Sequence, residues 1–194
     1  MASEPEIVLE ILDRVFATLN VPYVVGGSVA SSVYGLPRTT QDIDVMADLK
    51  MEQAQELVEK LEKEFYIDLN AVREAIRTKA SFNAIHLSLM HKIDVFVAPA
   101  TPWAQQELTR ARRQSLSHDP EAHVFPLSSP EDNILHKLEW YELGRRISDR
   151  QWSDILGVLR VQSGALDHAY LGQWAGKLGL ATLLETAIKE AGNK

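Results

Sequence analysis

Cysteine is absent from the 194 residues of the chain. Its absence excludes disulfide bonds, thiolate metal sites and cysteine nucleophiles, and it is typical of a protein that works in a reducing cytoplasm. Long apolar runs are also lacking, so we expect no membrane-spanning helix. The N-terminal segment is acidic and amphipathic, without the basic and apolar regions of a secretory signal peptide, and we therefore expect a cytoplasmic protein.

Basic residues are fewer than acidic ones. The sequence holds 20 Lys and Arg against 27 Asp and Glu, which gives a formal net charge of −7. This balance argues against a protein that coats DNA, because such a protein carries a basic surface. It leaves room for a local basic patch and for a metal–nucleotide substrate. Hydrophobic residues make up 45% of the chain, an ordinary globular proportion.

The chain falls into two parts with different patterns. Residues 1–102 alternate helical and strand patterns, whereas residues 103–194 are mainly helical, with breaks at glycines. We predict helices over 5–19, 28–34 and 51–65, and strands over 23–25, 42–46, 82–89, 92–97 and 123–127. The expected fold is therefore α+β, with a mixed β-sheet core in 1–102 and a mainly helical part, 103–194, packed on it.

Two carboxylates stand one residue apart on a predicted strand. The alternation of side chains places Asp42 and Asp44 on the same face, with Cα atoms roughly 6.5–7 Å apart, while Ile43 and Val45 point into the core. Neighbouring carboxylates repel each other unless a cation lies between them, and hard oxygen ligands suit Mg²⁺ or Mn²⁺. The alternative is a pair of acids on a solvated strand face.

Asp94 is the one acid of the apolar segment 92–97. A lone carboxylate in a central strand is costly unless it is paired or bound to a metal. If this strand lies beside the strand of Asp42 and Asp44, three carboxylates converge. Three acids can hold two divalent ions for an in-line phosphoryl displacement. The alternative is an edge-strand acid that faces water.

Gly26, Gly27 and Ser28 form a turn between a predicted strand and a predicted helix. Glycines allow a close backbone approach, and a helix N-terminus attracts phosphate. No Walker or dinucleotide-binding pattern follows, and a bare Gly-Gly-Ser is often a plain turn. Its combination with a D-x-D strand and a lone strand Asp is much more specific.

This combination resembles the nucleotidyltransferase-fold superfamily. The stretch VVGGSVASSVYGLPRTTQDIDVM is similar to its hG[GS] and D-h-D motifs, with Asp94 as the third carboxylate. Gly35, Arg38, Thr40 and the D-I-D segment resemble the AbiEii-type and related minimal nucleotidyltransferases, some of which are toxins of toxin–antitoxin pairs. The segment SSPEDNILHKLEWYELGRRISDRQWSDI is also similar to that branch.

The resemblance implies transfer of a nucleoside monophosphate from a nucleoside triphosphate (NTP) to an acceptor hydroxyl. Asp42 and Asp44 would bind both of two metal ions, Mg²⁺ or Mn²⁺, and Asp94 would complete one metal site and help to deprotonate the acceptor. Gly26, Gly27 and Ser28 would hold the triphosphate. A mixed sheet of about five strands with a helical C-terminal part is the implied fold.

Three further residues follow from the same resemblance. Lys137 flanks the apolar stripe of a predicted helix and would contact the triphosphate; without the resemblance it reads as a boundary lysine. Arg38 precedes the D-I-D strand, where an ordinary surface arginine is the alternative. Asp154 matches a later acid of the family, but helical periodicity places it opposite the apolar stripe of its helix, so pattern and match disagree.

The acceptor stays open at the level of sequence. A macromolecule is one class, with tRNA or another RNA favoured, an antitoxin protein as a partner of a toxin, and a protein hydroxyl as an alternative. A small molecule such as an aminoglycoside is a second class, and a non-catalytic relative that binds nucleotide or a partner is a third. Arg110, Arg112 and Arg113, on an expected short helix or loop, suit an RNA backbone or a solvated face.

Overall fold

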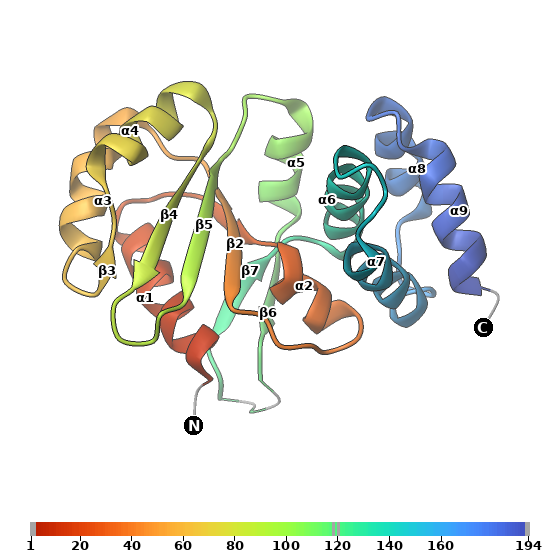
Figure 1. Ribbon diagram of the computed structural model, residues 1–194, viewed down its shortest axis with the longest axis horizontal. Coiled ribbons are helices and arrows are strands. Elements are labelled where there is room, and N and C mark those ends of the chain that lie inside the picture. Colours follow the sequence, from red (N-terminus) through yellow and green to blue (C-terminus); the bar gives the residue numbers. More distant parts are fainter. Residues whose placement is uncertain (1–2, 118, 120, 193–194) are drawn as a thin grey trace. The chain divides into compact units, whose positions relative to one another are not determined.

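The computed structural model describes residues 3–117, 119 and 121–192 and is shown in Figure 1. Its helices are α1 (Glu4–Thr18), α2 (Gly27–Tyr34), α3 (Ala54–Leu61), α4 (Leu69–Thr78), α5 (Pro102–Arg110), α6 (Pro130–Leu143), α7 (Asp149–Val161), α8 (His168–Lys177) and α9 (Ala181–Gly192), with a 3₁₀ helix η1 (Met51–Gln53). Its strands are β1 (Tyr23–Val25), β2 (Asp42–Ala47), β3 (Phe65–Tyr66), β4 (Ser81–His86), β5 (Lys92–Val97), β6 (Arg112–Ser115) and β7 (Val124–Leu127).

The chain divides into two compact units, each made from two segments. Unit 1 comprises residues 1–26 and 40–127, and unit 2 comprises residues 27–39 and 128–194. The division differs from the expected boundary at 102/103 for a physical reason. Strands β6 and β7 follow that boundary and complete the sheet of unit 1, while α2 leaves the N-terminal half to join the helices of unit 2.

Unit 1 is built on one mixed sheet. Within the described residues the sheet has seven strands in the order β3-β4-β5-β2-β1-β7-β6. Strands β2 and β5 are parallel, as are β1 and β7, and the remaining neighbours are antiparallel. The predicted class, a mixed sheet with flanking helices, is confirmed. Arg112 and Arg113 lie in β6, so their placement on a helix or loop was wrong.

The central strands bury one face and leave the other more open. Ile43 and Val45 on β2 and Ile93 and Val95 on β5 are at most 1% exposed, which places them in the core of unit 1. Each such side chain stabilises the fold by about 1.5–3 kcal/mol relative to exposure. Because side chains alternate along a strand, the residues between them point to the opposite face. The acids of β2 and β5 are among these residues.

Unit 2 consists of helices held together by buried polar contacts as well as apolar ones. Helix α6 begins as the sequence predicts, because Ser129 Oγ accepts the backbone N–H of Asp132 at 3.1 Å and Pro130 occupies the first turn. Asn133 Nδ2 donates to Ser31 Oγ of α2 at 2.8 Å. Tyr170 Oη of α8 donates to Asp132 Oδ1 at 2.6 Å. In Figure 1, α2, α6 and α7 lie side by side.

Among the described residues, none of the helices combines the length and the hydropathy that a membrane crossing requires.

Candidate active site

Strands β2 and β5 bring the predicted carboxylates to one face of the sheet. Asp44 and Asp94 are direct partners in the parallel ladder, and Asp42 lies opposite Lys92. Neighbouring strands are about 4.8 Å apart, so Asp44 and Asp94 are adjacent. The side chain of Asp94 is 19% exposed and that of Asp42 is 60% exposed. We call Asp42, Asp44 and Asp94 the carboxylate face.

Lys92 belongs to this face and was not singled out from the sequence. Its Nζ atom lies 2.7 Å from Asp94 Oδ2 and 3.7 Å from Asp42 Oδ1. The hydrogen bond to Asp94 raises the pKa of Lys92 above its ordinary value; desolvation opposes this shift, and the negative charges of Asp94 and Asp42 add to it. The lysine is therefore a charged partner of two of the three acids.

The chemistry of the carboxylate face fits a hard divalent cation. Carboxylate oxygens are the donors that Mg²⁺ and Mn²⁺ prefer, and two of them stand in register on adjacent strands. In the part of the chain that the structure describes, no three acidic or histidine side chains are already arranged around one ion position. The positive charge between Asp42 and Asp94 comes from the ammonium group of Lys92.

The backbone next to Asp44 is open. The backbone N–H of Gly26 donates to the carbonyl oxygen of Asp44 at 2.9 Å, which places Gly26 at the end of β1 beside the carboxylate face. A Cβ atom built on Gly26 would have no heavy atom within 4 Å. Thr40 Oγ1 donates to the carbonyl oxygen of Asp42 at 2.9 Å, just before β2 begins.

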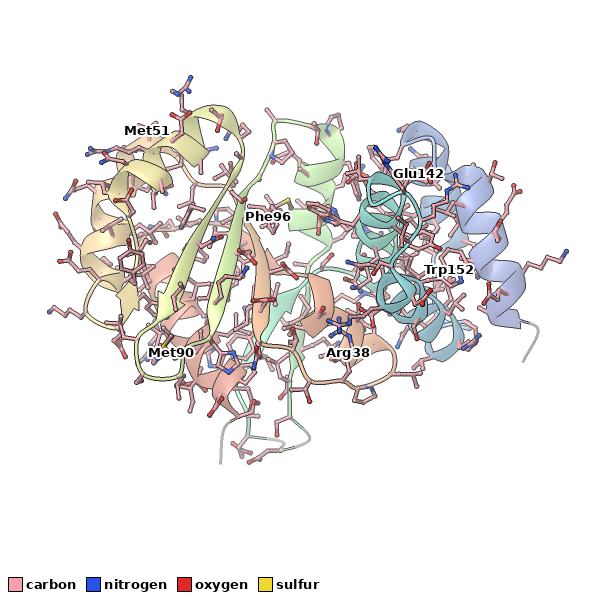
Figure 2. All side chains as sticks on the ribbon, in the orientation of Figure 1. Arg38, Met51, Met90, Phe96, Glu142 and Trp152 are labelled. Carbon is pink, nitrogen blue, oxygen red and sulfur yellow. The ribbon has the colours of Figure 1, made fainter. Side chains whose placement is uncertain are left out.

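The remaining predicted residues belong to unit 2, where α2 begins at Gly27. Gly27 adopts φ +55°, a backbone conformation that residues with a Cβ atom rarely take. Arg38, labelled in Figure 2, follows α2 and donates from Nη2 to Ser28 Oγ. Ser32 Oγ ties this loop back to the helix, because it contacts both the backbone oxygen and the backbone nitrogen of Arg38.

Lys137 and Asp154 form a buried ion pair inside unit 2. The Nζ of Lys137 lies 2.8 Å from Asp154 Oδ2 and donates to Gln151 Oε1 at 3.0 Å. Arg38 binds both carboxylate oxygens of Asp154 at 3.0 Å. The side chains of Lys137 and Asp154 are only 4% and 7% exposed. We call Ser28, Arg38, Lys137, Gln151 and Asp154 the basic cluster.

Asp154 is the counter-ion of two cations. Burial raises the pKa of its carboxyl group, but hydrogen bonds from Arg38 and Lys137 together with their charges outweigh burial, and the pKa lies below the ordinary value. Asp154 is thus ionised at neutral pH and orients both cations. Gln151 joins this cluster although no sequence motif marked it, since one glutamine on an amphipathic helix carries no signal of its own.

Comparison with solved structures places the fold among nucleotidyltransferases. The solution structure of the antibiotic-resistance factor ANT(2'')-Ia matches with a TM-score of 0.54 and 16% identity, over 96% of this chain and 94% of that chain. Its crystal structure in complex with adenylyl-2''-tobramycin gives a TM-score of 0.54 over 95% and 98% of the two chains, again at 16% identity.

A further match is the crystal structure of an antigenic nucleotidyltransferase-like protein from Paracoccidioides brasiliensis, with a TM-score of 0.54, 18% identity, and 95% and 91% of the two chains covered. Neither protein-family models nor curated proteins gave a match to this sequence. At these identities the likeness shows the nucleotidyltransferase fold.

Proposed function

We propose that this protein is a metal-dependent nucleotidyltransferase that moves a nucleoside monophosphate from an NTP to an acceptor hydroxyl. The observation that carries the proposal is the in-register pair Asp44 and Asp94 on the open face of β2 and β5, in a chain with the nucleotidyltransferase fold. A divalent ion is held by carboxylates in such chemistry, and Asp42, two residues before Asp44 on the same face, supplies the third.

In this reaction the acceptor oxygen forms a bond to the α-phosphorus, the bond from that phosphorus to the bridging oxygen breaks, and pyrophosphate leaves. A bound Mg²⁺ or Mn²⁺ ion neutralises charge on the phosphates. Asp42 and Asp44 would hold two such ions, and Asp94 would complete one of the two metal sites and help to take up the proton of the acceptor hydroxyl. These roles rest on the resemblance of the D-I-D segment and Asp94 to the superfamily.

The resemblance to the superfamily assigns the triphosphate to Gly26, Gly27, Ser28, Arg38 and Lys137. Gly27 offers a backbone N–H group at the start of α2, and Ser28 offers a hydroxyl in its first turn. Gly26 donates its N–H to Asp44 and serves the triphosphate only by having no side chain to block it. Arg38 and Lys137 supply two positive charges whose geometry Asp154 fixes. Because Asp154 already orients both cations, they lose little conformational entropy when they bind phosphate.

Two acceptor classes have specific support. The resemblance to AbiEii-type proteins favours an RNA acceptor such as tRNA, with a toxin role and an antitoxin partner. An aminoglycoside-like small molecule is the second candidate, because the structural neighbour ANT(2'')-Ia was captured with adenylyl-2''-tobramycin. Arg113, one of the three arginines considered for an RNA backbone, donates to the carbonyl oxygen of Val124 and so helps to join β6 to β7.

Label transfer tests the proposal. We expect the protein with Mg²⁺ and one of the four α-labelled NTPs to label an acceptor, either an RNA band from total RNA or tobramycin supplied as a pure compound. Asp44→Asn should lower transfer by more than about 100-fold, because it removes a charge that binds the metal without leaving a cavity.

Asp48→Asn is the matched control, since Asp48 pairs with Lys50 at 2.6 Å outside the carboxylate face, and we expect it to retain wild-type transfer. Full activity of folded Asp44→Asn protein contradicts the assignment of the carboxylate face. Label on a protein band would redirect the acceptor to protein hydroxyls, and no label with RNA, protein or tobramycin would count against nucleotidyl transfer to these acceptors.

A further inference from the structure

The position of Lys92 within the sheet is fixed by register rather than by chance contact. In the parallel ladder Lys92 is the partner of Asp42, and two residues later Asp94 is the partner of Asp44. Since alternate residues of a strand share a face, the lysine and all three acids must point the same way. Phe96, labelled in Figure 2, continues this face of β5.

Negative charge exceeds positive charge on the carboxylate face. Three carboxylates and one ammonium group leave two negative charges, which is the charge that a single divalent ion balances. The ammonium group lies at hydrogen-bond distance from Asp94 and within reach of Asp42, so it sits against two of the oxygens that a metal ion would use. The side chain of Lys92 is 38% exposed, which leaves its flexible end free to swing toward solvent.

Taking the proposed function as the premise, we propose that Lys92 is a resident counter-ion of the carboxylate face, which a divalent ion must displace in order to bind. Lys92 holds Asp42 and Asp94 together while no metal is bound and thereby suppresses their mutual repulsion. It also weakens the affinity for the free ion, because binding requires the ammonium group to leave Asp94. Lys92 is a positioning residue, and its effect reaches the reaction through the metal.

An ordinary surface ion pair would behave differently. Exposed pairs of Lys and Asp contribute little and do not change when a metal is added. Lys50 and Asp48 provide such a pair in the same unit, with Nζ and Oδ1 separated by 2.6 Å and the lysine 51% exposed. Lys50→Met is therefore a matched control for Lys92→Met, since each substitution keeps the aliphatic length and removes one ammonium group.

The test uses the full chain without nucleotide and Mn²⁺ as the probe. Calorimetric titration should show Lys92→Met binding Mn²⁺ roughly tenfold more tightly than the wild type, because one positive charge near the ion is gone. In EDTA the same variant should melt at a lower temperature than the wild type, and saturating Mn²⁺ should raise its Tm by more than it raises that of the wild type. Lys92→Arg keeps the charge and should stay close to the wild type, as should Lys50→Met.

Equal Mn²⁺ affinities for folded wild type and Lys92→Met would overturn the role of Lys92 while leaving nucleotidyl transfer intact, which the label assay on the wild type reports separately. Loss of Mn²⁺ binding in folded Lys92→Met would overturn it too, since the lysine would then support the ion. Failure of every variant to bind Mn²⁺ would overturn both this role and the metal dependence of the proposed function.

Discussion

Asp154 shows how a single residue can satisfy two conflicting sequence signals. Helical periodicity places it away from the apolar stripe of α7, and the stripe residues Ile155 and Leu156 are buried as expected. Yet its side chain is 7% exposed, because Arg38 and Lys137 cover it. Hydrophobic periodicity reports apolar burial only, so it cannot reveal a carboxylate that is buried by charged partners. The resemblance to the family marked this acid only by its match to a later motif position, and a role of Asp154 in the site stays a prediction.

The stability that Asp154 supplies should depend on pH. Its pKa is lower in the folded than in the unfolded chain, so the stabilisation is complete above the unfolded value of about 3.9 and is lost as pH falls through the folded value. We expect Asp154→Asn to lower the free energy of unfolding at pH 7 by about 3 kcal/mol, because a buried ion pair loses one partner. The difference in melting temperature between the variant and the wild type should become smaller below pH 4, and thermal melting across pH 3–7 measures it.

Asp149→Asn is the control for this comparison, since Asp149 lies exposed in the first turn of the same helix. A difference in melting temperature between wild type and Asp154→Asn that stays constant down to pH 3 would contradict the role of the carboxylate charge.

At the scale of elements, helix α2 is joined to α7 by a contact that only a glycine permits. A Cβ atom on Gly35 would lie 2.9 Å from both the carbonyl oxygen of Ser31 and the backbone nitrogen of Val158. Both atoms are backbone, so neither can turn aside. The glycine of the family-like G-x-x-R segment therefore serves the packing of unit 2, and Arg38 follows it on the loop that the basic cluster needs.

Gly35→Ala should consequently lower the free energy of unfolding by about 1–3 kcal/mol through overpacking. Gly172 in α8 offers the opposite case, because a Cβ there meets nothing within 4 Å. Gly172→Ala should raise stability by about 0.5–1 kcal/mol, as expected for glycine in a helix interior. Chemical denaturation of the two variants measures both effects, and a Gly35→Ala protein as stable as the wild type would show that the two helices separate readily.

Elements with an internal pattern were predictable from the sequence, and those defined by their partners were not. Strands β2, β4 and β5 alternate apolar residues, and α6 begins with a Ser-Pro signal, so both kinds were expected where they occur. Strand β6 has the sequence RRQS, which carries no apolar alternation, and it is a strand because it pairs with β7. Helix α4 was missed, although Asp68 caps it and Val72, Ala75 and Ile76 have helical spacing.

The same distinction applies to the candidate site. Asp42, Asp44 and Asp94 could be singled out because acids on apolar strands stand out from their background. Lys92 could not, because a lysine at the start of a strand is common and its meaning comes from the register of β2 against β5. Register is a tertiary property, set by the pairing of two distant segments.

At the scale of the whole molecule, neither unit is a continuous stretch of chain. Helix α2 is inserted between β1 and β2 but contacts α6 and α7, and Gln162 Nε2 of unit 2 donates to the carbonyl oxygen of Tyr34 at 2.9 Å. A fragment of residues 128–194 would thus lack a helix against which its own helices are built.

We expect the fragment 128–194 to melt over a broad range at low temperature, because the surfaces of α6 and α7 that α2 covers would be exposed. Fusing residues 27–39 to it through a Gly-Ser linker should restore a cooperative transition, whereas a scrambled 27–39 segment should not. Circular dichroism against temperature distinguishes the three proteins. A sharp transition for the bare fragment would show that α2 is dispensable to unit 2.

The pairing of β1 with β7 also joins two strands that are synthesised far apart in time. Val25 and Leu127 are partners in the ladder, so the ribosome must add about 100 residues after β1 before its second neighbour exists. At 5–20 residues per second this takes about 5–20 s, during which one edge of β1 stays open to other chains. The nascent protein therefore carries an unpaired edge of β1 until β7 emerges, and a chaperone that binds extended apolar segments would shield that edge over this interval.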